Sequence, residues 1–217
     1  MVKAVTTITP HRISFAGGGT DIAKFYEEYG GKILSTTIDK YLYVTVKKHS
    51  PLFEEQYRIC YSKTERANSL ENIENEIARE CIRLVPQSSP LYISTVSDIH
   101  SSSGLGSSSS FAVGLLYALH VLRGEKVSAG QLAEEACKVE IEILNKPIGK
   151  QDQYAAAYGG LNHFKIDKKG SVNVEHILPD KEQLDKLFDS IMLFWTGIQR
   201  KSEDVLNDQL DSIEKKY

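Results

Sequence analysis

The feature that most constrains the fold is the run Ser-Ser-Ser-Gly-Leu-Gly-Ser-Ser-Ser-Ser at residues 101–110. It lies between an alternating apolar run at 91–96 and an apolar run at 111–122, an order that predicts a strand, a glycine-rich loop and a buried helix. Such a loop presents unpaired N–H groups beside the positive end of a helix dipole, which favours a bound anion. Gly104 and Gly106 lack the Cβ atoms that would keep a phosphate away from the backbone. The alternative is a serine-rich surface turn, and the buried helix behind the loop argues against it.

The type of loop narrows the choice of nucleotide-binding family. It lacks the Gly-Lys-[Ser/Thr] ending of a Walker motif, and it is not a dinucleotide fingerprint. The sequence Ser-Ser-Gly-Leu-Gly-Ser-Ser-Ser resembles the ATP-phosphate loop of the GHMP kinases, which include galactokinase, homoserine kinase, mevalonate kinase and phosphomevalonate kinase. The resemblance implies that the ATP phosphates are held by Ser103, Gly104, Leu105, Gly106, Ser107 and Ser108.

A second motif, at residues 10–21, reads Pro-His-Arg-Ile-Ser-Phe-Ala-Gly-Gly-Gly-Thr-Asp and follows a predicted strand at 2–9. Its purely structural interpretation is a glycine turn in which Thr20 or Asp21 caps a helix at 22–29. The stretch also resembles the first GHMP motif, Pro-x-Arg followed by a glycine loop that ends in Thr-Asp. Galactokinases have Gly-Glu-His-Thr-Asp at this place, whereas the triple glycine resembles heptose 7-phosphate kinases, with fucokinases next.

This second resemblance implies roles for six residues. Arg12 would stabilise the ionised acceptor and the transferring phosphoryl group. Asp21 would accept hydrogen bonds from sugar hydroxyls, and the glycines would let the substrate approach the backbone. The implied sugar-binding residues are Gly17, Gly18, Gly19, Thr20 and Asp21.

A third motif joins two carboxylates. A helix predicted at 128–144 carries Glu140 on its apolar face, where a carboxylate needs a cation or a metal as partner. The alternative is a surface glutamate at the edge of the apolar face. Asp152 precedes a short helix predicted at 154–158, as an N-cap or as a catalytic carboxylate. Their context resembles the family segment Glu…Pro-x-Gly-x-x-Asp-Gln. The resemblance implies that Ser108 and Glu140 bind Mg²⁺ and that Asp152 takes or orients the acceptor proton.

The rest of the chain predicts an α+β fold. Strands at 31–38 and 41–49 are expected to form a hairpin through Asp39-Lys40, with further strands at 57–62, 161–166, 172–177 and 191–196. Helices are expected at 68–85, 180–188 and from 199 onward. The family resemblance implies the GHMP kinase fold, a mixed sheet with helices on one side. Residues 1–180 would form the N-terminal ATP-binding domain, and 181–217 the beginning of a truncated C-terminal domain.

Composition limits the class of protein. The 217 residues carry a formal net charge of −3 and 41% hydrophobic residues, which is typical of a soluble globular protein and argues against a nucleic-acid binder. Three scattered cysteines indicate neither disulfides nor zinc and favour the cytoplasm. We expect neither a secretion signal nor a membrane span.

The resemblance implies an ATP- and Mg²⁺-dependent kinase that phosphorylates the anomeric hydroxyl of D-glycero-D-manno-heptose 7-phosphate, for nucleotide-heptose and surface polysaccharide synthesis. Two alternatives stay open: a fucokinase-like or other sugar kinase of the family, and a non-catalytic nucleotide- or sugar-binding fragment. The family's third motif has no match in this sequence. Together with the apolar strand expected at 191–196, this favours a homo-oligomer or a complementing chain.

Overall fold

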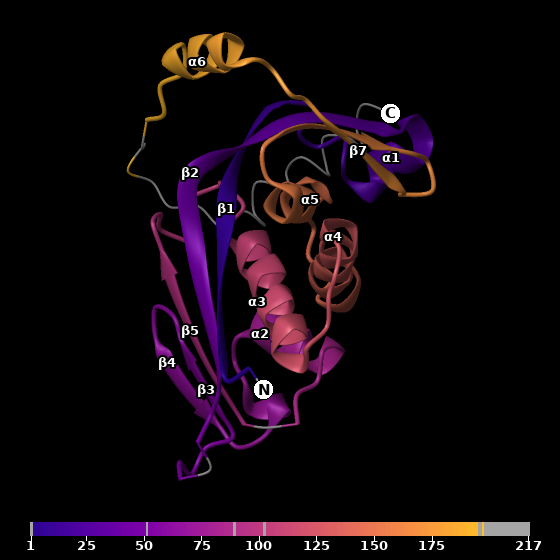
Figure 1. Cartoon of the computed structure of the whole chain (residues 1–217). Helices are drawn as coiled ribbons and strands as arrows, with labels where there is room; N and C mark the ends of the chain where they lie inside the picture. The colour runs from indigo at the N-terminus through magenta and orange to yellow at the C-terminus, as the bar shows by residue number, and fades with distance from the viewer. Residues whose placement is uncertain (1, 51, 89, 102, 195–196, 198–217) are drawn as a thin grey trace.

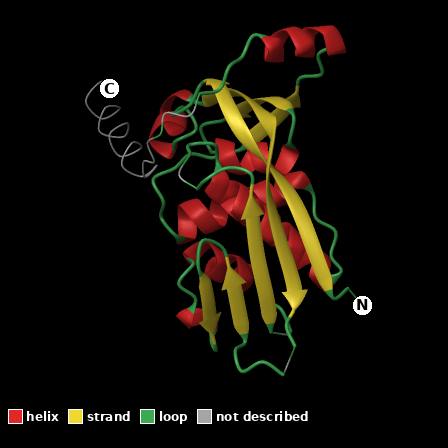
Figure 2. Ribbon diagram, turned by 90° about the vertical axis from the view of Figure 1, so that its left-hand side faces the viewer, coloured by secondary structure: helices red, strands yellow, loops and turns green. Residues whose placement is uncertain are grey.

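The computed structural model describes residues 2–194, except 51, 89 and 102, together with residue 197. Within this part of the chain, seven strands form one mixed sheet in the order β4-β3-β5-β2-β6-β7, with β1 on the other edge of β2 (Figure 1). Figure 2 shows the strands side by side with the main helices behind them. The strands are β1 (Ala4–Ala16), β2 (Gly31–Lys48), β3 (Tyr57–Cys60), β4 (Thr64–Ala67), β5 (Leu91–Ser97), β6 (Leu161–Ile166) and β7 (Val172–His176). The sheet with helices on one face confirms the predicted α+β class.

Strand β2 is the central strand of this sheet. Its first half pairs with β6 and its second half with β5, while β1 runs antiparallel along its opposite edge. The hairpin predicted at Asp39-Lys40 is therefore wrong, because both residues lie inside one continuous strand. Three β2 residues, 38–40, lie opposite the single residue His11, since Pro10 pairs with Tyr41 and Arg12 with Thr37. The surplus residues form a bulge instead of a turn, because β1 continues to supply hydrogen bonds on both sides of it.

Most of the helices cover one face of the sheet, whereas the last one, α6 (Lys181–Asp189), stands apart from it (Figure 1). The others are α1 (Ala23–Tyr29), α2 (Glu76–Leu84), α3 (Ser107–Arg123), α4 (Ala129–Cys137) and α5 (Gln151–Tyr158), with a 3₁₀ turn η1 (Leu70–Asn72) and a π-helical segment η2 (Lys138–Ile143). Helix α3 is buried on most sides, as its apolar sequence predicts, and its Leu115, Leu116 and Leu119 have no solvent exposure. These leucines pack against Val44 and Ile93 of the sheet. The helix that follows the phosphate loop is therefore held firmly by the main core.

Several other expectations fail in detail. The helix predicted at 68–85 begins only at Glu76, after the 3₁₀ turn, because Asn75 accepts the capping hydrogen bond from the backbone of Ala78. Strand β4 follows β3 after a short turn and was not predicted. Residues 191–194 are not in a strand, and the remainder of the strand and helix predicted beyond them lies outside the described residues. The expected C-terminal domain at 181–217 therefore stays a prediction.

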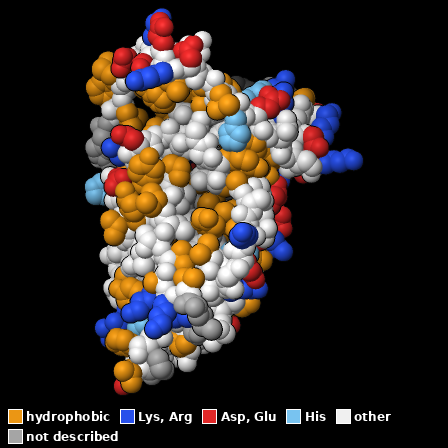
Figure 3. Space-filling model, viewed as in Figure 1, with side chains coloured by type: hydrophobic (Ala, Val, Ile, Leu, Met, Phe, Trp, Pro, Cys, Tyr) orange, Lys and Arg blue, Asp and Glu red, His pale blue; other side chains and the backbone are white. Residues whose placement is uncertain are grey.

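A hollow of about 350 Å³ lies between β1, α3, α4 and the end of α5. Its lining includes Ile8 and Tyr117, whose exposed fractions are 60% and 44%, and it includes none of the residues predicted above to bind ATP, sugar or metal or to catalyse transfer. Figure 3 shows apolar side chains spread over this face of the molecule. Within the described residues, no helix has both the length and the apolar character needed to cross a membrane.

Gly114 lets α3 approach β1 closely, and its replacement tests this packing. A Cβ at this position would lie 2.6 Å from Thr9 Oγ1 and 3.1 Å from Thr7 Oγ1. We expect Gly114→Ala to lower the free energy of unfolding by about 1–3 kcal/mol, measured by urea denaturation. In the double variant with Thr9→Ala the loss should be smaller than the sum of the two single losses. Full additivity would contradict the proposed contact.

Candidate functional site

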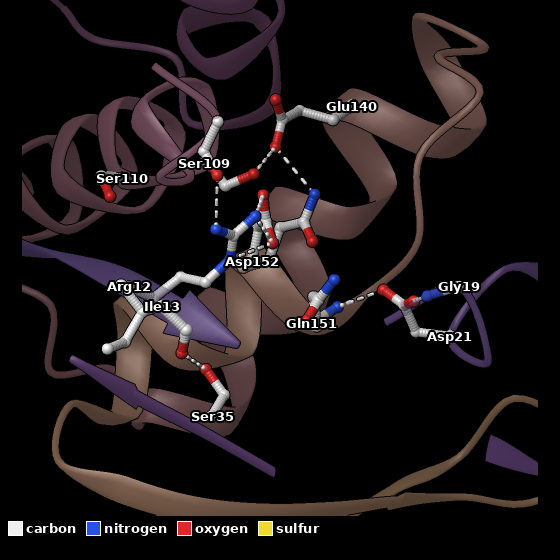
Figure 4. A network of polar contacts seen from close by, with 12 residues as sticks. Arg12, Ile13, Gly19, Asp21, Ser35, Ser109, Ser110, Glu140, Gln151 and Asp152 are labelled. Carbon is white, nitrogen blue, oxygen red and sulfur yellow. Dashed lines mark hydrogen bonds and ion pairs between the residues drawn. The ribbon is translucent and has the colours of Figure 1, made fainter. Parts of the chain in front are cut away.

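The predicted functional residues meet at one end of α3. Arg12 comes from β1, the phosphate loop joins β5 to α3, Glu140 lies in the π-helical segment and Asp152 lies in α5. Figure 4 shows these side chains around a common space, with Asp21 and Gln151 beside it. Residues from distant parts of the sequence therefore form one polar cluster.

Arg12 and Asp152 form the centre of this cluster. Arg12 donates from Nε to Asp152 Oδ1 and from Nη2 to Oδ2, both at 2.7 Å, and from Nη1 to the Gly104 carbonyl, also at 2.7 Å. The interpretation of Asp152 as an N-cap is wrong, because Lys150 occupies that position and Asp152 lies in the first turn of α5. The side chains of Arg12 and Asp152 are only 13% and 23% exposed, so the pair is partly shielded from water. Arg12 has five N–H donors, and these three bonds leave two of them for a ligand.

The phosphate loop bends over this pair. Gly104 and Gly106 adopt φ values of 76° and 79°, which side-chain-bearing residues rarely adopt. A Cβ on Gly106 would lie 3.3 Å from Arg12 Cγ and 3.4 Å from Asp152 Oδ2. The backbone N–H of Arg12 donates to the Leu105 carbonyl at 3.1 Å. The loop therefore lies directly against both charged residues.

Unpaired hydroxyl groups stand at the start of α3. The buried hydroxyls of Ser103 and Ser107 have no hydrogen-bond partner among the described residues, whereas Ser110 Oγ donates to the Pro10 carbonyl at 2.9 Å. The first N–H groups of α3 have no partners within the helix and point the same way. This arrangement suits an anion with several oxygens, such as a nucleotide phosphate.

Glu140 is fully buried, and one of its two carboxylate oxygens accepts hydrogen bonds. Its Oε2 accepts from Ser109 Oγ at 2.6 Å and from Gln153 Nε2 at 2.8 Å (Figure 4). Its Oε1 has no hydrogen-bond partner in the described part of the chain and lies 3.7 Å from Lys146 Nζ. The serine in contact with Glu140 is Ser109, whereas Ser108 is exposed, and the joint binding of Mg²⁺ by Ser108 and Glu140 stays a prediction.

These atoms fit Mg²⁺. A free carboxylate oxygen beside hydroxyl groups offers oxygen ligands, and Mg²⁺ is usually held by one or two carboxylates together with substrate phosphates and water. The described residues contain no group of three or more His, Cys, Asp or Glu residues placed to hold a metal by themselves. Such a sparse set of ligands is suited to a metal that arrives with a nucleotide.

The triple-glycine loop is fixed by Thr20 and Asp21. Thr20 Oγ1 donates to the Gly17 carbonyl at 2.7 Å and accepts from the Lys32 backbone at 3.1 Å. Asp21 accepts from the backbone N–H groups of Gly19, at 3.1 Å, and Gln151, at 3.0 Å. Neither residue caps α1, contrary to the expectation, because the N-cap position is Ile22 and carries no side-chain cap.

Asp21 ties this loop to the start of α5. Asp21 is only 2% exposed, and this burial raises the pKa of its carboxyl group. A Cβ on Gly149 would lie 2.0 Å from Asp21 Oδ2, so this glycine is required for the close approach. Asp21 thus positions the glycine loop beside Asp152, whatever further contact it makes with a ligand.

Gly18 has room for a side-chain atom, unlike Gly17 in the same loop. A Cβ there would lie 3.9 Å from Gln151 Nε2 and 4.0 Å from Ser14 Oγ, which are ordinary contact distances. The buried Oε1 of Gln151 has no hydrogen-bond partner among the described residues. Sequence reasoning missed Gln151 and Ser14, and only the position of Gln151 next to Asp152 could have pointed to it.

Comparison with known proteins agrees with the motifs. Residues 69–160 match the domain described as GHMP kinases N terminal domain, a range that includes the phosphate loop, Glu140 and Asp152. The chain is 31% identical over 216 residues to D-glycero-alpha-D-manno-heptose 7-phosphate kinase of Campylobacter jejuni, a match that covers 94% of this chain and 63% of that protein. Galactokinase of Pyrococcus furiosus is 24% identical over 92% of this chain and 55% of its own length.

Solved structures with a similar fold include a heptose phosphate kinase. A solved structure of a D-glycero-D-manno-heptose 1-phosphate kinase from Bacteroides thetaiotaomicron superposes with a TM-score of 0.76 at 27% identity, over 84% of this chain and 62% of that one. The chain therefore spans between about half and two thirds of the length of these relatives.

Two glycine substitutions test the geometry of the glycine loop. Gly149→Ala would push a methyl group against Asp21, so we expect the free energy of unfolding to fall by about 1–3 kcal/mol in urea denaturation. Gly18→Ala is the matched control, because its methyl group meets neighbours only at ordinary contact distances. Its stability should stay within about 0.5 kcal/mol of the unchanged protein. Equal losses in the two variants would contradict the described packing of Asp21.

Proposed function

Because the chain belongs to the GHMP kinases, we propose that it transfers the terminal phosphoryl group of ATP to a hydroxyl group of a sugar. The observation that carries the proposal is the Arg12–Asp152 pair beneath the phosphate loop. It places a carboxylate that can accept a proton beside a cation that can stabilise negative charge, next to a loop suited to phosphate.

The nucleotide would lie with its phosphates against the loop that joins β5 to α3. The backbone N–H groups of residues 103–108 and the free hydroxyls of Ser103 and Ser107 are the donors available there. Glu140, through its unpaired Oε1, and a hydroxyl of Ser108 or Ser109 are the groups that would hold Mg²⁺. When bound, Mg²⁺ neutralises the charge that develops on the phosphoryl oxygens during transfer.

Asp152 would accept the proton of the acceptor hydroxyl, and Arg12 would stabilise the transferring phosphoryl group. A carboxylate has about four lone-pair sites, and the bonds from Arg12 leave some of them free to accept the proton of the sugar hydroxyl. The two remaining N–H donors of Arg12 can then reach the transferring phosphoryl group. Positioning and charge stabilisation supply most of the catalysis in phosphoryl transfer, and the site is built for both.

The acceptor would lie on the triple-glycine loop. Gly18 leaves its backbone uncovered, and Ser14 and Gln151 offer a hydroxyl and an unpaired amide oxygen beside it. The relatives are named for heptose 7-phosphate and heptose 1-phosphate, so a heptose phosphate is the substrate class we propose. More specifically, we propose that the protein phosphorylates the anomeric hydroxyl of D-glycero-D-manno-heptose 7-phosphate in the cytoplasm. This reaction would be a step toward nucleotide-activated heptose and surface polysaccharide.

The role of Asp152 is tested by Asp152→Asn. An amide cannot accept the acceptor proton, so we expect transfer to fall by about a hundredfold or more, while Mg-ATP binding stays within about fivefold. The measurement is phosphorus NMR of the protein with Mg-ATP and heptose 7-phosphate, in which anomeric phosphate and ADP signals grow with time.

The control for this test is Asp185→Asn, an exposed residue of helix α6 outside the cluster, which should behave as the unchanged protein. Turnover by Asp152→Asn at the rate of the unchanged protein would overturn the assignment. If the unchanged protein phosphorylates fucose or galactose but not heptose 7-phosphate, the kinase stands and the acceptor is corrected.

The position of the acceptor is tested by Gly18→Ala. The added methyl group fits the fold but occupies the space between Ser14 and Gln151, so we expect KM for the sugar to rise by about tenfold or more. KM for ATP and the urea midpoint should not change. A sugar KM equal to that of the unchanged protein would place the acceptor elsewhere.

A further inference from the structure

Residue His11 of β1, which lies opposite the bulge in β2, contacts one end of the phosphate loop, and its neighbour Arg12 contacts the other. His11 is fully buried, and its Nε2 lies 3.2 Å from Oγ of Ser97, the last residue of β5. The next residue, Arg12, contacts the far end of the loop through the Leu105 and Gly104 carbonyls. Two consecutive residues of one strand therefore contact the loop where it begins and where it ends.

The hydrogen bonds around Ser97 define the state of the His11 ring. Ser97 Oγ donates its only proton to the Ile99 carbonyl at 2.8 Å and accepts from the Ile99 backbone at 3.3 Å. With Ser97 donating to Ile99, the ring Nε2 is assigned as the donor to Ser97, and Nδ1 is then the unprotonated nitrogen whenever the ring is neutral. Nδ1 is buried and has no hydrogen-bond partner among the described residues.

We propose that His11 is a positioning residue that holds the phosphate loop in its nucleotide-binding shape. The proposal goes beyond the motif residues, since none of the roles assigned above uses this side chain. The mention of a nucleotide rests on the proposed function, whereas the effect on the loop does not. A β-bulge is suited to this task because it turns neighbouring side chains toward positions that a regular strand does not reach.

The charged surroundings of the ring give the contact a pH dependence. Burial lowers the pKa of His11 from its ordinary 6.5, and the Arg12 guanidinium lowers it further, while the Leu105 carbonyl and the Asp98 carboxylate act in the opposite direction. The unfolded chain therefore binds more protons than the fold at slightly acid pH. Stability contributed by the buried neutral ring is fully present above the unfolded pKa and is lost as the pH falls from that value through the lower pKa of the folded state.

The experiment is amide hydrogen exchange of the free, full-length chain, followed by mass spectrometry. Peptides that cover the loop between β5 and α3 report on loop opening, and peptides that cover β3 and β4 report on the rest of the fold. The variants are His11→Ala, which removes the ring, and His11→Gln, whose amide nitrogen can replace Nε2 without titrating. The control is His163→Ala, which removes a histidine ring of β6 whose Nδ1 lies 3.2 Å from Glu175 of β7.

We expect loop exchange in His11→Ala to be about fivefold to tenfold faster at neutral pH, the size of effect that follows from losing one buried hydrogen bond. His11→Gln should restore most of the protection, and His163→Ala should have no effect on the loop. When the pH is lowered to about 5.5, loop exchange in the unchanged protein should rise relative to His11→Gln measured at the same pH.

Two results would overturn the proposal. One is unchanged loop exchange in both His11 variants, and the other is an equal rise in every peptide, which would make His11 a support of the whole fold. Titration with Mg-ATP separates this inference from the proposed function. If the unchanged protein does not bind Mg-ATP while loop exchange responds to His11, the kinase proposal fails and the positioning role stands. If it binds, His11→Ala should bind about tenfold more weakly, and equal affinity would show that the loop shape does not matter to the nucleotide.

Discussion

The ion pair between Arg12 and Asp152 is the interaction on which the rest of the site depends. It joins the end of β1 to the start of α5, and the same guanidinium holds the Gly104 carbonyl of the phosphate loop. A pair of this kind contributes less to net stability than its short distances suggest, because both groups lose water when the fold forms. Its importance lies in geometry, since loss of either partner would leave the other charge partly buried, and loss of Arg12 would also release the Gly104 carbonyl of the loop. The absence of a side chain on Gly106 completes the arrangement by allowing the loop to lie against both residues.

The sheet explains why this pair can form at all. The continuous strand β2 carries β1 along one edge and β5 and β6 along the other, so that β1 delivers Arg12 to the place where β5 ends. Local sequence signals at Asp39-Lys40 predict a hairpin, and the long-range pairing with β1 overrides them. The mismatch is absorbed as a bulge in β2 opposite His11, one residue before Arg12. The error in the prediction and the placement of the site therefore have the same physical origin, a pairing between distant segments that local patterns do not contain.

The sequence predicted which residues would meet and missed how some of them are arranged. Arg12, Glu140, Asp152 and the phosphate loop lie together as the motifs imply. The choice between Ser108 and Ser109 could not be predicted, because successive residues of a helix point about 100° apart and the exact start of the helix decides which one faces Glu140. The contact of Asp21 with the backbone of Gln151 depends on the approach of two loops that are distant in sequence. Neither relation leaves a periodic signal in the sequence.

The two carboxylates of the cluster illustrate how surroundings divide chemical tasks. Asp152 is bonded on both oxygens by a cation and stays partly exposed, so a hydroxyl group can still approach its free lone pairs. Glu140 is fully buried, receives hydrogen bonds on one oxygen only, and has Lys146 at 3.7 Å from the other. A buried carboxylate oxygen without a hydrogen-bond donor is unfavourable, and a divalent cation would remove that penalty more completely than a distant lysine. These surroundings support the proposal that Asp152 takes part in proton transfer and that Glu140 binds a metal, although the two residue types are chemically almost the same.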